Sequence, residues 1–278
     1  MNQKNYQYLS DSMEKMGFGN VLNNALKTKL ELGFDEFELK AKTRFGGDVV
    51  QYDLKFEKGK SPDVEEHYLF LNRVKTTLTK ENGEAITQEF PLFKQNDYTK
   101  EQMYNMLEKR PIYKIFRKDG EKVGRWVKLD FNNKDENGNA IIRPYYDNVT
   151  NFSLEREIGK LNLYFANRQE KEDMMRDLQN GDLVQVSIRQ KGKNESAYVS
   201  VAPQIGGLIL FNSEMKEIKR TNSSNVELVP DDALKVSSPT PNNSETKEQQ
   251  LPEATKQLMA KANNPGIKES QQTKRKIS

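Results

Sequence analysis

The chain has 278 residues, of which 35% are apolar and 31% are charged, with a formal net charge of +3, one histidine and no cysteine. The lack of cysteine excludes disulfide frameworks, thiolate nucleophiles, zinc ribbons and iron–sulfur sites, and a single histidine excludes a two-histidine metal site. The low apolar fraction predicts that part of the chain does not fold. We expect no catalytic residue, no metal site and no cofactor.

The N-terminus is polar and is not followed by an uninterrupted apolar stretch. The longest apolar run, Ile205 to Phe211, is far shorter than the roughly 20 residues that cross a bilayer. These features predict a soluble, cytoplasmic protein that makes no membrane contact. They leave the oligomeric state open.

The first predicted segment, residues 1–95, combines a helix with two hairpins. An apolar stripe of helical period runs from about Asn20 to Leu32. Apolar residues stand at every second position from Phe37 to Phe56, on both sides of a glycine-rich turn. This is the strongest hairpin pattern in the chain. Two further strands are predicted at His67 to Leu78 and at Ala85 to Phe93.

The second predicted segment, residues 96–150, opens with a helix whose capping box begins at Thr99. A three-stranded meander follows, because turn residues separate three strand-like runs. These runs are Ile112 to Phe116, Val123 to Phe131 and Ala140 to Tyr145.

The third predicted segment, residues 151–220, contains helices at Ser153 to Lys160 and at Arg168 to Gln179, the latter closed by Gly181. Its strands are expected at Leu183 to Arg189, Ala197 to Val201 and Leu208 to Phe211. Runs of strands after each helix favour antiparallel sheets, because a parallel sheet needs a helix between successive strands. The predicted fold is therefore α+β, with repeated units of a helix plus an antiparallel meander that pack on one another.

Residues 221–278 form a predicted disordered tail, since the stretch is polar, contains prolines and has no aromatic residue. Apolar residues spaced four apart predict a short helix at 252–262, either one that orders on a partner or one that frays in solvent. Two contacts with a partner are predicted in the tail. One is the apolar residue Leu258 of this helix, and the other is a basic cluster that can bind phosphates or an acidic surface, formed by Lys274, Arg275 and Lys276.

The loop Asn133 to Gly138 has oxygen-bearing side chains at alternate positions, like the start of an EF-hand calcium loop. Pro144 stands at the twelfth position, where such a loop needs a bidentate glutamate, so a polar hairpin turn is the better interpretation. His67 is interpreted as a residue at the start of a strand. An enzymatic alternative, carboxylate-dependent hydrolysis, would use a nearby group whose spacing is that of an ordinary solvated loop: Asp63, Glu65 and Glu66.

An aromatic and basic group of residues on the predicted strand Val123 to Phe131 is the candidate binding surface. Val127 and its alternate neighbours are expected to face the core, which places Trp126 and Lys128 on the other face, beside Arg125. An exposed tryptophan among cations can stack a nucleic-acid base or an aliphatic surface. Alternatively, a neighbouring segment covers this face and buries Trp126. The candidate residues, including those of the next strand, are Arg125, Trp126, Lys128, Arg143, Tyr145 and Tyr146.

Several stretches within residues 1–220 occur together in this chain: Met1 to Tyr6 with Tyr8-Leu9, Gly17 to Gly19, the Phe37 to Phe56 hairpin, Leu78 to Glu84, Leu129 to Asp135 and Asn137 to Asn139. This combination resembles an uncharacterised family carried on conjugative transposons and related mobile elements of gut bacteria. The family usually has a Tyr-Gly-Tyr-Asp-Leu-like stretch where this chain has Val149 to Leu154. The resemblance implies a cytoplasmic accessory protein of a mobile element and supplies no site residue.

We expect a non-enzymatic binding protein that contacts a protein or a nucleoprotein complex of the element through its sheet surfaces and its flexible tail. The alternative is direct binding of DNA or RNA through the surface that carries Trp126, Lys128 and Arg143.

Overall fold

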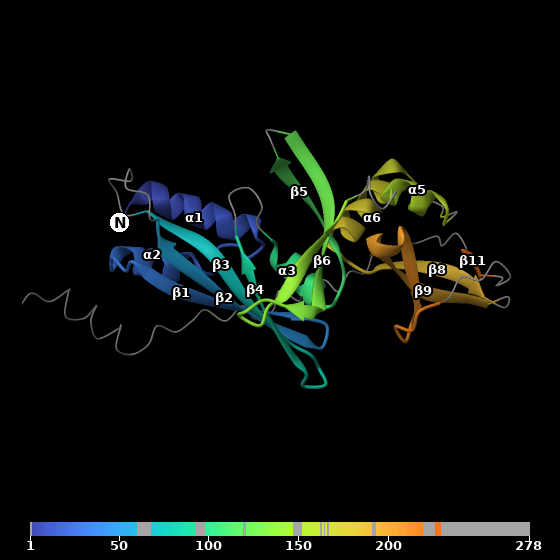
Figure 1. The fold of residues 1–278 in the computed structure, drawn as a ribbon, viewed down its shortest axis with the longest axis horizontal. Coiled ribbons are helices and arrows are strands. Elements are labelled where there is room, and N and C mark those ends of the chain that lie inside the picture. The colour runs from blue at the N-terminus through green and yellow to red at the C-terminus, as the bar shows by residue number, and fades with distance from the viewer. Residues whose placement is uncertain are drawn as a thin grey trace, which may run out of the picture. The chain divides into compact units, whose positions relative to one another are not determined.

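The structure is a computed structural model that describes residues 2–59, 68–92, 98–118, 121–146, 152–161, 163, 165, 167–190, 193–218 and 226–228. These residues all belong to one compact unit, Met1–Lys247. They form helices and three antiparallel sheets (Figure 1), which confirms the predicted α+β class. No helix in the described ranges is long and apolar enough to cross a membrane.

The first sheet is a meander with the strand order β1-β2-β3-β4. The hairpin predicted from the alternating pattern is confirmed, since Phe37 pairs with Phe56 and Phe45 pairs with Asp48. Buried and exposed residues alternate along these strands, as expected for a sheet with one face on a core. The strands are β1 (Glu36–Phe45), β2 (Asp48–Lys58), β3 (Leu69–Thr79) and β4 (Ala85–Pro91).

Two helices pack on this sheet. Helix α1 (Gln3–Lys15) contacts β3 and helix α2 (Asn23–Glu31) contacts β1 (Figure 1). Helix α2 lies within the predicted range, whereas α1 is absent from the predicted elements.

The buried residues of α1 recur every four positions, at Asn5, Leu9 and Met13. Asn5 interrupts the apolar stripe, which makes the helix hard to recognise in the sequence. Its side-chain amide donates to the Leu69 carbonyl at 2.8 Å and accepts from the Leu69 N–H at 3.0 Å. A polar residue therefore stands where α1 meets the first residue of β3, and both of its hydrogen-bonding functions are satisfied there.

Helix α3 (Lys100–Leu107) lies at the centre of the contacts between elements, because it touches β3, β4, β5, β6 and α6. The predicted capping box is confirmed: the Gln102 N–H donates to the Thr99 hydroxyl at 3.1 Å, and the Thr99 N–H donates to the Gln102 side chain at 3.3 Å. Every residue of α3 except Glu101 is buried. The helix is thus covered on all sides.

The second sheet has the order β5-β6-β7, with strands β5 (Ile112–Lys118), β6 (Glu121–Lys134) and β7 (Ala140–Tyr145). One apolar cluster joins the first sheet, α1, α2 and α3 to Val127 and Leu129 on β6. The first two predicted segments therefore share a core. The segment boundaries themselves stay predictions.

The loop between β6 and β7 is a polar hairpin turn, as predicted. The Asp135 carboxylate accepts the backbone N–H groups of Asn137 and Asn139 at 2.9 and 2.8 Å. The loop is attached to β4, since the Glu89 N–H donates to the Asn139 side chain at 2.9 Å and the Ala140 N–H donates to Gln88 at 2.9 Å.

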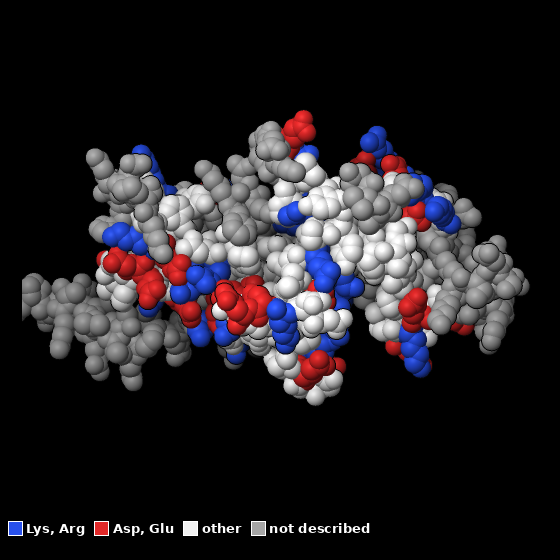
Figure 2. Space-filling view, in the orientation of Figure 1, with Lys and Arg blue, Asp and Glu red and all other residues white. Residues whose placement is uncertain are grey.

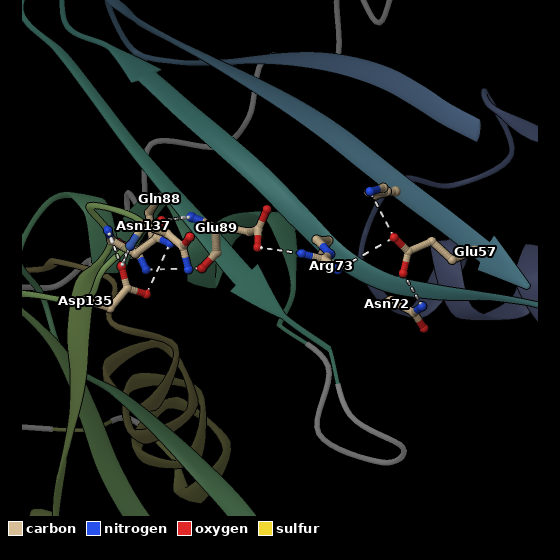
Figure 3. Close-up of polar contacts among 9 residues, drawn as sticks. Glu57, Asn72, Arg73, Gln88, Glu89, Asp135 and Asn137 are labelled. Carbon is tan, nitrogen blue, oxygen red and sulfur yellow. Dashed lines mark hydrogen bonds and ion pairs between the residues drawn. The ribbon is translucent and has the colours of Figure 1, made fainter. Parts of the chain in front are cut away.

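Figure 3 shows this attachment together with a line of ion pairs across the first sheet. Arg73 lies 3.6 Å from Glu57 and 3.2 Å from Glu89. Hydrogen bonds from Asn72 and Lys55 lower the pKa of Glu57 to about 2. The ion pair between Arg73 and Glu57 therefore persists through the mildly acidic pH range.

The remaining described residues contain helices α5 (Leu154–Gly159) and α6 (Arg168–Asn180), close to their predicted ranges. A third antiparallel sheet has the order β10-β9-β8-β11. Its elements, with a short 3-10 helix η1, are β8 (Val184–Gln190), β9 (Lys193–Ala202), η1 (Pro203–Ile205), β10 (Gly207–Asn212) and β11 (Val226–Leu228).

Strand β11 is the one described element within the predicted tail, residues 221–278, whose other residues lie outside the described ranges. It pairs antiparallel with β8. Valine and leucine are compatible with a strand, and the edge of a sheet offers backbone groups that a short strand can satisfy. The predicted helix 252–262 and the predicted contacts Leu258, Lys274, Arg275 and Lys276 lie outside the described residues.

The C-terminal end of α6 docks on α3. Gly181 ends the helix in the left-handed region, with φ of +86°. A Cβ atom at Gly181 would lie 2.9 Å from the carbonyl oxygen of Pro111 and 3.0 Å from the Cβ atom of Asn105. The position therefore requires glycine both for its backbone conformation and for the close approach of α3.

We expect Gly181→Ala to destabilise the protein more than Gly33→Ala does. Gly33 also has a positive φ, of +71°, but nothing lies within 4 Å of its missing Cβ atom. Gly33→Ala should cost roughly 1 kcal/mol for the left-handed backbone, and Gly181→Ala about 1–3 kcal/mol more for the steric contact. Urea unfolding of both variants measures the difference, and equal losses would show that α6 does not dock on α3 as described.

Candidate functional site

The two faces of β6 belong to different surroundings. Val127 and Leu129 are 1% and 3% exposed and lie in the core shared with the first sheet. Successive residues of a strand point to opposite faces, so Trp126 and Lys128 lie on the other face, as the sequence predicts.

Trp126 is only 2% exposed. Its ring lies edge-on to Tyr113 at 5.2 Å and to Phe152 at 5.7 Å between centroids. It belongs to a second apolar cluster that includes Leu154 of α5, Met174 of α6 and residues of β8, β9 and β10. The expectation of an exposed, stacking tryptophan is therefore wrong, and the alternative, burial by a neighbouring segment, is confirmed. The large apolar surface of an indole is the physical reason.

Arg125 and Tyr146 do not join the other candidate residues. The Arg125 guanidinium lies 3.7 Å from the centre of the Phe116 ring and donates to the Tyr146 hydroxyl at 2.8 Å. In the register of β6 with β7, Trp126 pairs with Tyr145 and Lys128 pairs with Arg143. The six predicted residues are thus divided between opposite faces of the sheet, and do not form one surface.

A hollow of about 460 Å³ opens on the Trp126 face, farther along the same two strands. Its basic side chains are Lys109, Lys128 and Arg143, and its aromatic side chains are Phe131 and Tyr145. The remaining lining residues are Leu129, Asp130, Asn132 and Gln204 of η1. We call this feature the basic hollow.

Asp130, the acidic residue that lines the basic hollow, already interacts with neighbouring residues. Asp130 forms an ion pair with Arg143, and it accepts hydrogen bonds from the Asn132 N–H at 3.1 Å and the Asn133 amide at 2.8 Å. The bond from Asn133 is the largest of the effects that lower the pKa of Asp130. Asp130 therefore stays ionised near neutral pH and balances the charge of Arg143 alone.

The two lysines of the basic hollow are not balanced in this way. Neither Lys109 nor Lys128 forms an ion pair with another described residue. Burial, and then the charge of Lys109, lower the pKa of Lys128. The Lys109 ammonium lies 5.9 Å from the centre of the Phe131 ring. An excess of positive charge thus collects in a partly desolvated hollow.

The chain as a whole is close to charge balance, with 44 Lys and Arg residues against 41 Asp and Glu residues. On the face shown in Figure 2, basic and acidic side chains of the described residues are interspersed, in keeping with a net charge of +3. A site of this kind favours an anion at one position over non-specific attraction across a broad surface.

Sequence reasoning includes Lys128, Arg143 and Tyr145 among the candidates but misses Lys109 and Phe131. Lys109 follows α3, where a lysine has an ordinary explanation as a favourable charge at a helix end. Phe131 is expected to face the core, but the register of β6 with β7 shifts between Asp130 and Lys134, and Phe131 reaches both the core and the hollow. A β-bulge of this kind leaves no clear mark in the sequence.

The residues of the enzymatic alternative, Asp63, Glu65 and Glu66, lie outside the described residues, and so does His67, which is predicted to start a strand. Within the described ranges, no three acidic or histidine side chains are grouped as ligands of a metal ion would be. Comparison with protein-family models, with curated proteins and with solved structures gave no match. The resemblance to a mobile-element family stays a prediction.

The burial of Trp126 can be tested by fluorescence, because it is the only tryptophan of the chain. We expect blue-shifted emission and weak quenching by iodide in the native protein, since the indole is 2% exposed. Unfolding in guanidinium should shift the emission to the red and restore quenching. If iodide quenched the native protein as strongly as the unfolded chain, the burial of Trp126 would be contradicted.

We expect Lys128→Met to raise the thermal midpoint of the free protein. The variant removes a partly desolvated charge that stands opposite Arg143 and near Lys109. Because the folded-state pKa of Lys128 is lowered, wild-type stability rises as pH increases from that value toward the unfolded value of 10.5. The advantage of the variant should therefore narrow at alkaline pH.

Lys122→Met is the matched control, because Lys122 is exposed on the same strand and does not line the basic hollow. Differential scanning fluorimetry at several pH values measures the midpoints. A loss of stability in Lys128→Met that Lys122→Met does not share would show that the Lys128 charge is favourable in the free protein.

Proposed function

We propose that this protein is a non-enzymatic binding protein that holds an anionic group of its partner in the basic hollow. One observation carries the proposal: three cations line a hollow in which the one carboxylate among the described lining residues already bonds to Arg143 and to two N–H donors. An anion placed there would gain charge-assisted hydrogen bonds and would relieve the repulsion between Lys109 and Lys128.

The chemistry of Asp130 favours binding over a reaction. A general acid or base works best when its pKa lies near the operating pH. The hydrogen bonds and the ion pair of Asp130 move its pKa in the opposite direction, below its ordinary value of 3.8. Its role is therefore to orient Arg143, whose guanidinium keeps further donors for a ligand.

The proposed partner is a protein or a nucleoprotein complex of a mobile genetic element, and the proposed setting is the cytoplasm. Both rest on the family resemblance. A second contact through a sheet edge is compatible with β5, the first strand of the order β5-β6-β7, on which Ile115 is 55% exposed. Such an edge can accept an added strand from a partner.

Titration with two labelled polyanions of equal charge tests the proposal. The probes are a single-stranded oligonucleotide and an oligoglutamate peptide, measured by fluorescence anisotropy with the full-length protein. We expect at least one probe to bind, with an affinity that falls as salt is added. Lys128→Glu and Lys109→Glu should each weaken binding tenfold or more, because each replaces attraction by repulsion at the ligand.

Lys122→Glu makes the same change of charge on the exposed part of β6 and should bind like the wild type. Equal weakening by all three substitutions would indicate non-specific attraction. Binding of neither probe would overturn the proposed function.

A further inference from the structure

The basic hollow combines two kinds of side chain that different ligands would use. Lys109, Lys128 and Arg143 suit an anion, whereas Phe131 and Tyr145 suit a flat or apolar group next to that anion. In an unmodified peptide, a carboxylate and an aromatic ring must come from two different residues. A nucleotide supplies a phosphate and a base within the length of one residue of the polymer, and bases stack on aromatic side chains.

The cations of the basic hollow come from two parts of the chain. Lys128 and Arg143 are paired across β6 and β7, so their side chains leave the same face of the sheet at neighbouring positions. Lys109 enters from the end of α3, where it has a φ of +64°, a backbone conformation that L-residues adopt rarely. This is a common ending of a helix, in which the Lys109 N–H donates to the Met106 carbonyl and the Arg110 N–H donates to the Asn105 carbonyl. The end of α3 thus fixes the backbone from which Lys109 reaches the hollow.

The size of the hollow separates single-stranded from double-stranded nucleic acid. A volume of about 460 Å³ lies within the roughly 300–1,000 Å³ of small-ligand pockets. In a duplex the bases are paired and stacked inside the helix, and only phosphates would reach the lysines. In a single strand the base is free to enter beside the aromatic side chains.

We propose that the basic hollow binds one nucleotide unit of a single-stranded nucleic acid, with its phosphate at Lys109, Lys128 and Arg143 and its base against Tyr145 or Phe131. This inference rests on the proposed function and names the class of its ligand. Trp126 takes no part, because it is buried on the same face of β6.

The test compares four labelled probes on the full-length protein by fluorescence anisotropy: an oligothymidylate, an abasic oligomer of the same length, a duplex of the same length and an oligoglutamate of equal charge. We expect the oligothymidylate to bind at least tenfold more tightly than the abasic oligomer, because only the first can stack. It should also bind more tightly than the duplex. Lys128→Met, which is expected to fold, should weaken both single-stranded probes.

Tyr145→Leu and Tyr146→Leu form a matched pair of neighbouring tyrosines. Tyr145 lines the basic hollow, whereas Tyr146 bonds to Arg125 on the opposite face. Tyr145→Leu should weaken oligothymidylate binding several-fold and leave the abasic oligomer unchanged, and Tyr146→Leu should change neither. Thermal melting of both variants verifies that they fold.

The outcomes separate this inference from the proposed function. Equal affinity for the oligothymidylate and the abasic oligomer, or tighter binding of the duplex, would overturn the nucleotide assignment. Binding of oligoglutamate alone, lost in Lys128→Glu, would also overturn it but would support the proposed function. Binding of no probe would overturn both.

Discussion

The side-chain amide of Asn105 connects α3 to the end of α6, and much of the structure depends on this connection. Asn105 is 1% exposed, and its amide donates to the Asn180 carbonyl at 2.9 Å and to the Asp182 carboxylate at 2.8 Å. Its oxygen accepts from Arg110, which also donates to the Gly181 carbonyl at 2.8 Å. A buried polar network is favourable only when every member is satisfied, so these bonds specify one arrangement of the two helices.

Burial has a cost in this network. Desolvation is the main cause of the raised pKa of Asp182, and the bond from Asn105 opposes it only in part. The carboxylate is tolerated because it accepts the second N–H of the Asn105 amide, whose first N–H goes to the Asn180 carbonyl. The specific docking of α6 on α3 thus requires a buried Asp182, whose ionised form is less favourable there than in water.

The docking of α6 also explains why β6 has two buried faces. Met174 and Leu178 of α6 join the cluster that covers Trp126, while Val127 faces the core of the first sheet. Farther along β6 the covering ends, and Lys128 opens into the basic hollow. The hollow therefore exists because one face of a strand is packed at one end and left uncovered at the other. Burial, and then the charge of Lys109, lower the pKa of Lys128 at that position, so its charge is less favourable there than in water.

The sequence by itself determined the elements whose patterns are local. The alternation from Phe37 to Phe56, the capping box at Thr99 and the helix end at Gly181 all appear in the structure, because neighbours in the chain decide periodicity, caps and left-handed turns. Helix α1 was not predicted, because the polar residue Asn5 interrupts its apolar stripe. The reason for a polar residue at this position is its hydrogen bonds to Leu69 of β3, which depend on tertiary packing.

Tertiary structure decided the surroundings of the candidate site. The alternation of β6 places Trp126 and Lys128 on one face, but it does not say that α5 and α6 cover the first and leave the second open. Nor does it bring Lys109 to Arg143, since that approach depends on α3 and on the register of β6 with β7. Contacts between distant parts of a chain depend on how whole faces pack, and the residues beside each of them in the sequence carry no record of that packing.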